Sequence, residues 1–175
     1  MIGCQRSGSN WLQLLIGEHF PHVAFPHPPH IFSNFKPILH RFGTLDEPEN
    51  FEKLVEAVCL FVESNPGPWN DKNNKAIIFD RIAISKRCTK NDLVSIFEAV
   101  MDIYAESNDC QTWICKSMTM SFHHQELLKH FGDRLKYIYL YRDPRDVCLS
   151  FRKVCILKAQ KLFGTLPTLL LSGFN

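Results

Sequence analysis

Two short segments, far apart in the sequence, carry residue types that bind phosphate groups. The first runs from Gly3 to Trp11, reads GCQRSGSNW and stands before an amphipathic stretch. Its glycines have the G-x-x-x-x-G spacing of a phosphate-binding loop, in which backbone amides and a helix N-terminus favour an anion. Arg6 adds a cation inside the loop. We therefore expect this segment to bind a phosphate-like group; the alternative is an ordinary helix cap formed by Ser7 or Ser9.

The first segment lacks two parts that a nucleoside triphosphatase needs. In such an enzyme the loop continues with Lys and then Ser or Thr, which contact the terminal phosphate and magnesium. Ser9 and Asn10 stand at these places. An ATPase or GTPase is therefore disfavoured, and no metal is expected. A P-loop kinase remains an alternative that strict dependence on magnesium would support.

The second segment, Tyr137 to Ser150, predicts a strand that delivers a cation to a ligand site. YIYLY is apolar and aromatic, which is typical of a strand buried in a parallel sheet, and ligands of such sheets bind beyond the carboxyl ends of the strands. Arg142 stands at that end, and Pro144 fits the first turn of a following helix. Ser150 comes about two helical turns later and could face the same site. The alternative is that Arg142 and its charged neighbours only pair with one another on the surface.

Both segments resemble motifs of the sulfotransferase family. QRSGSNWLQLLI is similar to the family's loop for the 5′-phosphosulfate group, and YRDPRDVCLS resembles its 3′-phosphate motif, R-N-P-x-D-x-x-x-S. The anchors of the second motif are all present, as Arg142, Pro144, Asp146 and Ser150. The resemblance covers roughly residues 1–153. It implies an α/β fold with a three-layer, P-loop-like arrangement, in which helices flank a parallel sheet.

The resemblance also implies a role for each matched residue. The donor would be 3′-phosphoadenosine-5′-phosphosulfate, and the acceptor a hydroxyl or amine of a small molecule. Arg6 matches the catalytic loop cation that stabilises charge as the sulfonate leaves, which is lysine in some members and arginine in others. Arg142 and Ser150 match the ligands of the 3′-phosphate. The other implied donor contacts are Ser7, Gly8, Ser9, Asn10 and Trp11. The indole of Trp11 is implied to stack on adenine, with core packing as the alternative.

A third segment, TWICKSM at residues 112–118, predicts a short strand that ends on Lys116. The resemblance implies that Lys116 contacts the sulfonate. Many members have K-T-H here, with the histidine as general base, and this chain has Lys-Ser-Met instead. The base is therefore expected elsewhere, and the loop FPHPPHIF favours His30 because an extended loop could reach the site. The other histidines considered are His27, His123 and His124.

The composition predicts one compact domain in a reducing compartment. The chain has 175 residues, of which 45% are hydrophobic, enough for a single core. The formal net charge of +2 predicts neither nucleic acid nor a membrane as a partner. Seven cysteines without a C-x-x-C pair favour a cytoplasmic protein without a disulfide framework. The oligomeric state stays open, with a homodimer as one alternative.

Alternating strands and helices are expected to position these residues. Hydrophobic periodicity predicts helices near 9–20, 49–64, 90–106 and 122–131, and another that starts at Pro144. Strands are predicted at 1–4, 113–115 and 137–141, whereas 76–79 is ambiguous and 21–48 is expected to be a polar loop. Such βαβ alternation predicts a parallel sheet with helices on both faces.

The two ends of the chain depart from the family pattern. Only Met1 to Cys4 precede the loop, whereas a buried strand usually has about five or six residues. After Lys153, VCILKAQKLFGTLPTLLLSGFN does not continue the pattern. We therefore expect a partial sulfotransferase-like domain at 1–153, an atypical tail at 154–175, and a truncated, alternatively spliced or mispredicted product. The alternative function is a catalytically inactive fragment that only binds the nucleotide.

Overall fold

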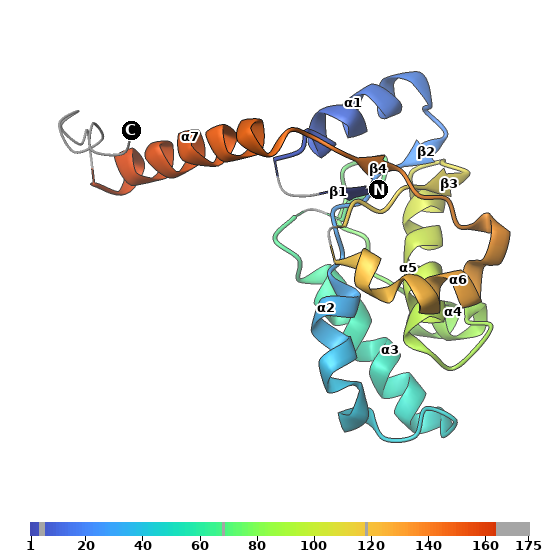
Figure 1. Ribbon diagram of the computed structural model, residues 1–175. Coiled ribbons are helices and arrows are strands. Elements are labelled where there is room, and N and C mark those ends of the chain that lie inside the picture. Colours follow the sequence, from blue (N-terminus) through green and yellow to red (C-terminus); the bar gives the residue numbers. More distant parts are fainter. Residues whose placement is uncertain (4–5, 68, 118, 164–175) are drawn as a thin grey trace.

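The computed structural model describes residues 1–3, 6–67, 69–117 and 119–163, and it describes only the backbone of Ile2 and of residues 156–163. Figure 1 shows the order of the elements. They are β1 (Ile2–Gly3), α1 (Ser9–His19), β2 (Val23–Ala24), α2 (Ile31–Phe35), α3 (Pro48–Glu63), α4 (Arg81–Arg87), α5 (Leu93–Ser107), β3 (Thr112–Trp113), α6 (His124–Phe131), β4 (Tyr139–Leu140) and α7 (Pro144–Phe163). Three 3₁₀ helices span Lys36–Phe42, Met120–His123 and Gly132–Arg134.

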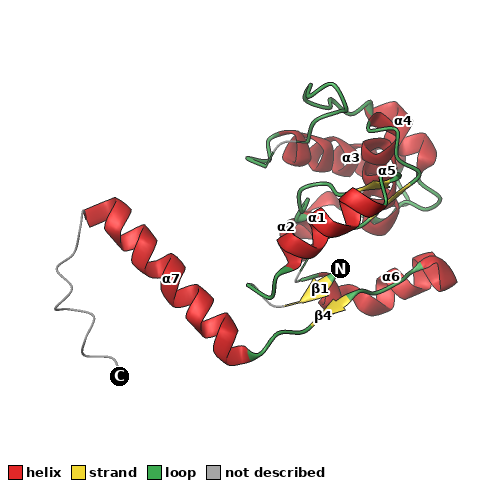
Figure 2. Ribbon diagram, turned by 90° about the horizontal axis from the view of Figure 1, so that it is seen from above, coloured by secondary structure: helices red, strands yellow, loops and turns green. Residues whose placement is uncertain are grey.

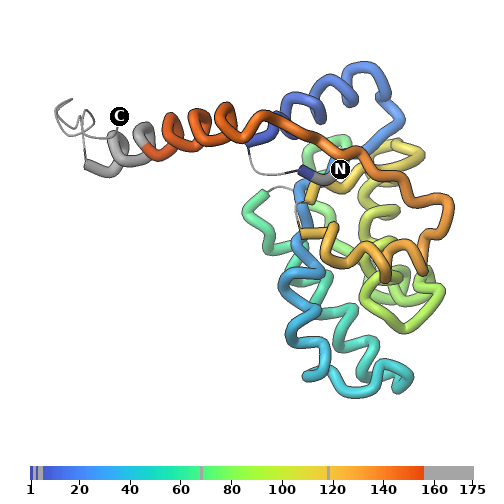
Figure 3. The backbone as a smooth tube through the Cα atoms, in the orientation of Figure 1, coloured from blue at the N-terminus to red at the C-terminus, as the bar shows by residue number. Residues whose placement is uncertain are grey.

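The strands form two parallel pairs that lie next to each other. β1 pairs with β4, and β2 pairs with β3. Two more backbone hydrogen bonds connect the pairs, because the Met1 nitrogen donates to the Cys115 carbonyl at 2.7 Å and the Ser117 amide donates to the Met1 carbonyl at 3.1 Å. The strands therefore lie in the order β2, β3, β1, β4. In the tube of Figure 3 the first residues run beside the segment that contains β4.

The strand order places β1 between strands that come later in the chain. The parallel pairing agrees with the prediction, but each strand has only two residues. The described strands thus form a small sheet and do not by themselves establish the extended three-layer sheet that the resemblance implies. In Figure 1, α1 lies above the strands and α2 to α6 lie below them, while α7 projects away from the other helices. Figure 2 shows the same projection of α7 from a second direction.

The hydrophobic core lies among the helices below the strands. α3 confirms the helix that hydrophobic periodicity predicted near 49–64, and the apolar residues of its inner face are all buried: Phe51, Leu54, Val55, Val58 and Val62. α5 contributes a further row of buried side chains, and Asp92 caps this helix by accepting a hydrogen bond from the Ser95 amide at 2.7 Å. None of the described helices is both long enough and apolar enough to cross a membrane.

The structure differs from the sequence prediction in the segment 21–48, which was expected to be a loop. It contains α2 and a 3₁₀ helix at Lys36–Phe42. Ile31, Phe32 and Phe35 of α2 are buried in the core, so tertiary packing outweighs the polar and proline-rich character of the segment. The ambiguous run 76–79 forms one isolated bridge, between Asn70 and Ala76, rather than a strand.

The expectation of a buried strand at 137–141 is wrong. The strand covers only Tyr139–Leu140, and the side chains of Tyr139 and Tyr141 are 73% and 77% exposed. β4 pairs with β1 along one edge, and none of the described helices covers these two rings. An apolar and aromatic run predicts a strand, but it does not reveal whether both faces of that strand are covered.

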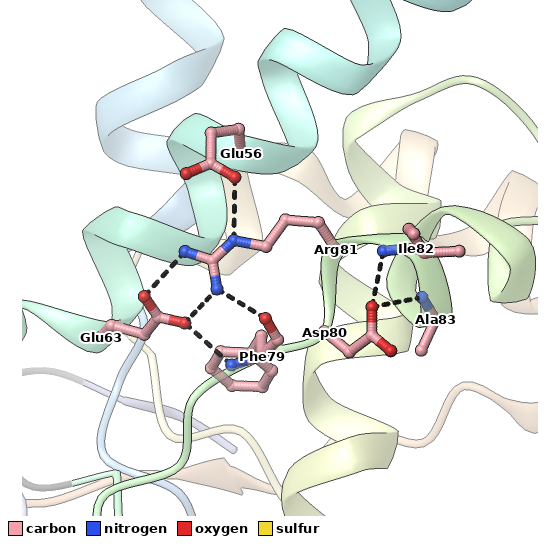
Figure 4. A network of polar contacts seen from close by, with 7 residues as sticks. All are labelled: Glu56, Glu63, Phe79, Asp80, Arg81, Ile82 and Ala83. Carbon is pink, nitrogen blue, oxygen red and sulfur yellow. Dashed lines mark hydrogen bonds and ion pairs between the residues drawn. The ribbon is translucent and has the colours of Figure 1, made fainter.

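A network of ion pairs around Arg81 ties α3 to the start of α4 (Figure 4). The guanidinium donates to both carboxylate oxygens of Glu63, at 2.5 and 2.9 Å, and to Glu56 at 2.9 Å. It also donates to the Phe79 carbonyl at 2.5 Å, and the Phe79 amide donates back to Glu63 at 2.8 Å. The Asp80 carboxylate caps α4 through the next two amides. The network therefore holds together the two ends of the segment that connects α3 with α4.

We expect Arg81→Ala to lower the free energy of unfolding by about 2–3 kcal/mol, because Glu63 then loses its partner while partly buried. The side chains of Arg81 and Glu63 are 26% and 18% exposed, so water replaces the lost bonds poorly. Urea denaturation measures the change. The matched control is Arg87→Ala, which breaks a more exposed pair with Glu106 and should cost at most about 1 kcal/mol. Equal losses for the two variants would contradict the expectation.

The same pair should make the difference between wild type and Arg81→Ala depend on pH. Burial alone raises the pKa of the Glu63 carboxyl, but hydrogen bonds from Arg81 and from the Phe79 amide hold that pKa below its ordinary value. A carboxyl whose pKa is lowered by folding stabilises the fold above its ordinary pKa and loses this contribution as the pH falls through the lowered value. The stability difference between the two proteins should therefore shrink on acidification.

Candidate functional site

Three basic residues follow the carboxyl ends of three neighbouring parallel strands. Arg6 comes shortly after β1, Lys116 after β3 and Arg142 after β4. β1 lies between the other two strands. After β1 the chain leads to α1 above the strands, whereas after β3 it leads to α6 below them (Figure 1). In open parallel sheets such a point gathers the loops at one edge and forms the usual ligand site. The order of the strands therefore explains why residues from distant parts of the sequence meet.

The two motifs of the sequence are in direct contact. An Nη of Arg142 donates to the carbonyl oxygen of Arg6 at 3.0 Å. The Nε of Arg6 donates in turn to Oγ of Ser150, at 2.9 Å, on the second turn of α7. These two hydrogen bonds connect the loop at Arg6 with the end of β4 and with the start of α7. All three residues were expected to contact the same ligand.

These residues surround one cavity of about 570 Å³. A volume of this size is within the range of small-molecule and cofactor sites. Nine residues that the sequence analysis selected line it: Arg6, Gly8, Ser9, Asn10, Trp11, His30, Lys116, Arg142 and Ser150. The other four described residues that line it are Met1, Gly3, Pro28 and Ser117. Gly3 is the first glycine of the loop motif, and Pro28 and Ser117 are neighbours of selected residues, whereas no local signal in the sequence indicates Met1.

The charges around the cavity have one sign. Arg6, Lys116 and Arg142 are basic, and no carboxylate is found among the described residues that line the cavity. Opposed charges would neutralise one another, whereas three cations in a partly enclosed space attract an anion. Arg6 and Gly8 have positive φ angles of 64° and 99°, which give the loop its sharp turn before α1. The described lining of the cavity therefore favours a negatively charged ligand.

Asn10 and Ser7, both in the loop before α1 or at its start, differ in their position relative to the cavity. The ammonium of Lys116 donates a hydrogen bond to Oδ1 of Asn10 and is thereby held over the start of α1. Ser7 is the one selected loop residue that does not line the cavity, because it is buried below the loop near Gly3. Its Oγ has no hydrogen-bond partner among the described residues. A buried hydroxyl without a partner is unusual and leaves a donor available beneath the loop.

Trp11 is 67% exposed at the edge of the cavity. The alternative that its indole packs in the core is therefore wrong. Leu14, one turn further along α1, is equally exposed at 67% but does not line the cavity. The open face of the indole is available for stacking on an aromatic ligand.

The four histidines that were considered as general base lie at different places in the structure. His30 lines the cavity. His27 lies against the backbone of Gly67, the ring of His123 packs on Phe32 with 5.0 Å between centroids, and His124 shares a hydrogen bond of 2.8 Å with the hydroxyl of Tyr137. Of these histidines, His30 alone is placed at the cavity by the described residues.

Charged neighbours of Arg142 also pair with one another, as the alternative interpretation of this segment required. Arg145 binds Asp143 at 2.7 Å, and this hydrogen bond holds the pKa of the Asp143 carboxyl below its usual range. Arg142 lies 4.0 Å from Asp146, one helical turn further along. The surface pairs do not account for the whole arrangement, however, because Arg142 also reaches the loop at Arg6.

Cys115, next to Lys116, is poorly suited to act as a nucleophile. Burial raises the pKa of the Cys115 thiol to about 11, so at neutral pH it stays protonated beside Lys116. Within the described parts of the chain, no group of three or more His, Cys, Asp or Glu side chains is arranged to hold a metal ion. The residues that converge on the cavity are suited to binding and stabilising negative charge.

Comparison with known proteins gave one match. A family model described as "Sulfotransferase family" matches residues 1–165 of the chain. No curated protein and no solved structure matches it. The matched range includes β1, β3, β4 and every residue that lines the cavity.

Proposed function

The chain belongs to the sulfotransferase family, and on that premise we propose that it transfers a sulfonate group from 3′-phosphoadenosine-5′-phosphosulfate to a hydroxyl or amine of a small-molecule acceptor. The observation that carries this proposal is the cavity that Arg6, Lys116 and Arg142 line together, with no carboxylate among its described lining residues. Family membership supplies the reaction class, and the charge of the cavity supports a donor that carries several negative groups.

The residues around the cavity fit such a donor. The loop at Arg6, Ser9 and Asn10 offers a cation, hydroxyl and amide groups and the N-terminus of α1 for the 5′-phosphosulfate end. Arg142 and Ser150 offer a guanidinium and a hydroxyl for the 3′-phosphate. Because Arg6 and Ser150 are hydrogen-bonded to each other, this contact has to open or be shared when an anion enters.

The transfer needs positioning and charge stabilisation rather than a covalent enzyme intermediate. As the bond between sulfur and the bridging oxygen breaks, negative charge builds up on the 5′-phosphate, where Arg6 and Lys116 can stabilise it. His30 is proposed as the general base that accepts the proton of the acceptor. The groups needed for this chemistry are thus side chains of the cavity itself.

The first test combines binding and turnover. Isothermal titration with adenosine 3′,5′-bisphosphate should show one site per chain, and radiolabelled sulfonate should pass from the donor to a member of a panel that contains 4-nitrophenol, an aliphatic alcohol and an arylamine. Binding without any transfer would support the alternative of a nucleotide-binding fragment. Absence of binding would reject both functions.

Trp11→Ala should weaken the binding of adenosine 3′,5′-bisphosphate about tenfold, since stacking on an aromatic side chain contributes about 1–3 kcal/mol per base. Leu14→Ala is the matched control, because this residue is equally exposed on the same helix but lies outside the cavity. Thermal unfolding of both variants checks that α1 stays intact. Equal affinity of the two variants for the nucleotide would remove Trp11 from the proposed site.

A further inference from the structure

Two residues at the cavity have a positive φ angle, a backbone conformation that is uncommon outside glycine. Four described residues other than glycine have positive φ angles: Arg6, His30, Asn74 and Asp109. Asn, Asp and His adopt this left-handed conformation more easily than other side chains do, and Arg does not. Two of the four, Arg6 at 64° and His30 at 54°, line the cavity. Strained backbone persists only where the surroundings hold it, and it tends to occur at functional sites.

The turn at His30 is held by hydrogen bonds to its carbonyl oxygen. Nδ2 of Asn34 donates to this oxygen at 2.8 Å, Oγ of Ser33 at 3.0 Å and the Asn34 amide at 3.2 Å. Asn34 alone thus supplies two donors, one from its side chain and one from its backbone. These bonds fix the orientation of the peptide that follows His30, and so limit the directions that its imidazole can take.

The residues that flank this turn are anchored in the protein. Pro29 is buried on one side of His30, and Ile31 and Phe32 are buried on the other. The imidazole between them is exposed at the cavity, and no described residue forms a hydrogen bond or an ion pair with its nitrogens. The scaffold is therefore fixed on both sides, while the ring stays available to a molecule in the cavity.

We propose that Asn34 is a positioning residue for sulfonate transfer, which acts by holding His30 in the left-handed conformation that presents its imidazole to the acceptor. This inference rests on the proposed function. In the step concerned, the acceptor oxygen forms a bond to sulfur and its proton passes to the imidazole. The bond between sulfur and the phosphate oxygen breaks, and its electron pair stays on the departing adenosine 3′,5′-bisphosphate. Asn34 does not touch the reacting atoms and acts only through His30.

The test is a double-mutant cycle with His30→Asn, Asn34→Ala and the double variant. Asparagine at position 30 removes the imidazole but tolerates the left-handed backbone. The matched control is Asn50→Ala, which removes a similar bond from an asparagine amide to a carbonyl, that of Thr44 at 3.1 Å, away from the cavity. Turnover is measured with the acceptor of the panel that the wild-type chain sulfonates fastest, and calorimetry with adenosine 3′,5′-bisphosphate measures donor-site affinity.

Asn34→Ala should lower kcat about 10- to 100-fold, because a small displacement of a reacting group is costly. Nucleotide affinity should stay at the wild-type value, and Asn50→Ala should change neither quantity. In the His30→Asn background, Asn34→Ala should have no further effect, since a residue that acts through the imidazole has nothing left to position. If His30→Asn leaves no turnover to measure, the loss of kcat at unchanged affinity in the single variant supports the inference.

Several results would overturn the inference. One is an unchanged kcat in Asn34→Ala, and another is an equal loss from this substitution with and without His30. A parallel loss of nucleotide affinity and thermal stability would show that Asn34 only supports the fold. Full turnover of His30→Asn would show that His30 is not the general base, and it would overturn the inference as well. These outcomes leave the assignment of the reaction itself intact, whereas an inactive wild-type chain that does not bind the nucleotide would reject that assignment first.

Discussion

Arg6→Ala should lower kcat for sulfonate transfer by about 100- to 1000-fold, which is the usual loss when one group that stabilises developing charge is removed. Arg6 lies in the loop after β1, lines the cavity, and is joined by hydrogen bonds to Ser150 and Arg142. Its guanidinium is therefore well placed to stabilise the oxygen that leaves sulfur. Transfer of radiolabelled sulfonate under saturating donor and acceptor measures the effect.

Two further variants separate the charge of Arg6 from its structural contact. Arg6→Lys keeps the cation and the strained backbone, and should retain most of the turnover that Arg6→Ala loses. Ser150→Ala removes the hydrogen bond between the loop and α7 but leaves the cation. We expect it to weaken nucleotide binding more than it lowers kcat. A wild-type kcat in Arg6→Ala, measured on folded protein, would contradict the catalytic role.

Arg142→Ala should weaken binding of adenosine 3′,5′-bisphosphate by about 10- to 100-fold, since a hydrogen bond to a charged group contributes about 1.5–3 kcal/mol. A guanidinium can bind two phosphate oxygens at once. The second guanidinium of this motif, that of Arg145, is paired with Asp143 and does not line the cavity. Isothermal titration measures the change. Adenosine 5′-monophosphate, which lacks the 3′-phosphate, should bind wild type and variant with similar affinity if Arg142 contacts that group.

The same segment of the chain offers a matched control for Arg142. Arg145→Ala removes an exposed guanidinium that binds Asp143 and does not line the cavity. It lowers the net charge by the same amount, so a general electrostatic effect should appear in both variants. Equal weakening of nucleotide binding in the two variants would contradict the assignment of the 3′-phosphate site to Arg142.

The proximity of the selected basic residues could be predicted from the sequence better than the sheet that carries them. The positions of Arg6, Lys116 and Arg142 after strands followed from the alternation of strands and helices, and the structure places all three around one cavity. The order of the strands could not be predicted, because it depends on which distant segments pair. A hydrogen bond such as that of Ser117 to Met1 leaves no signal in the local sequence.

The other differences between the sequence prediction and the structure also arise from contacts between distant segments or from weak local signals. Tyr139 and Tyr141 belong to a run whose apolar and aromatic character is typical of a covered strand, yet their rings face solvent. The prediction failed because a local sequence pattern does not specify which elements lie next to a strand. α4 was missed because only Asp80 marks its start, and the helix is short. The importance of Asn34 could not be predicted at all, since its contact with the His30 carbonyl depends on the conformation of a single strained turn.

The pairing of β1 with β4 has a consequence for the way the protein acquires its shape. Arg6 and Ser150, which are hydrogen-bonded to each other at the cavity, are separated by 144 positions along the chain. Closing so long a loop costs entropy before any contact compensates for it, so topologies of this kind fold slowly. During synthesis β1 has no partner strand on this side until β4, more than 130 residues later, has left the ribosome. The helical core can form earlier, and the anion site is therefore expected to mature last.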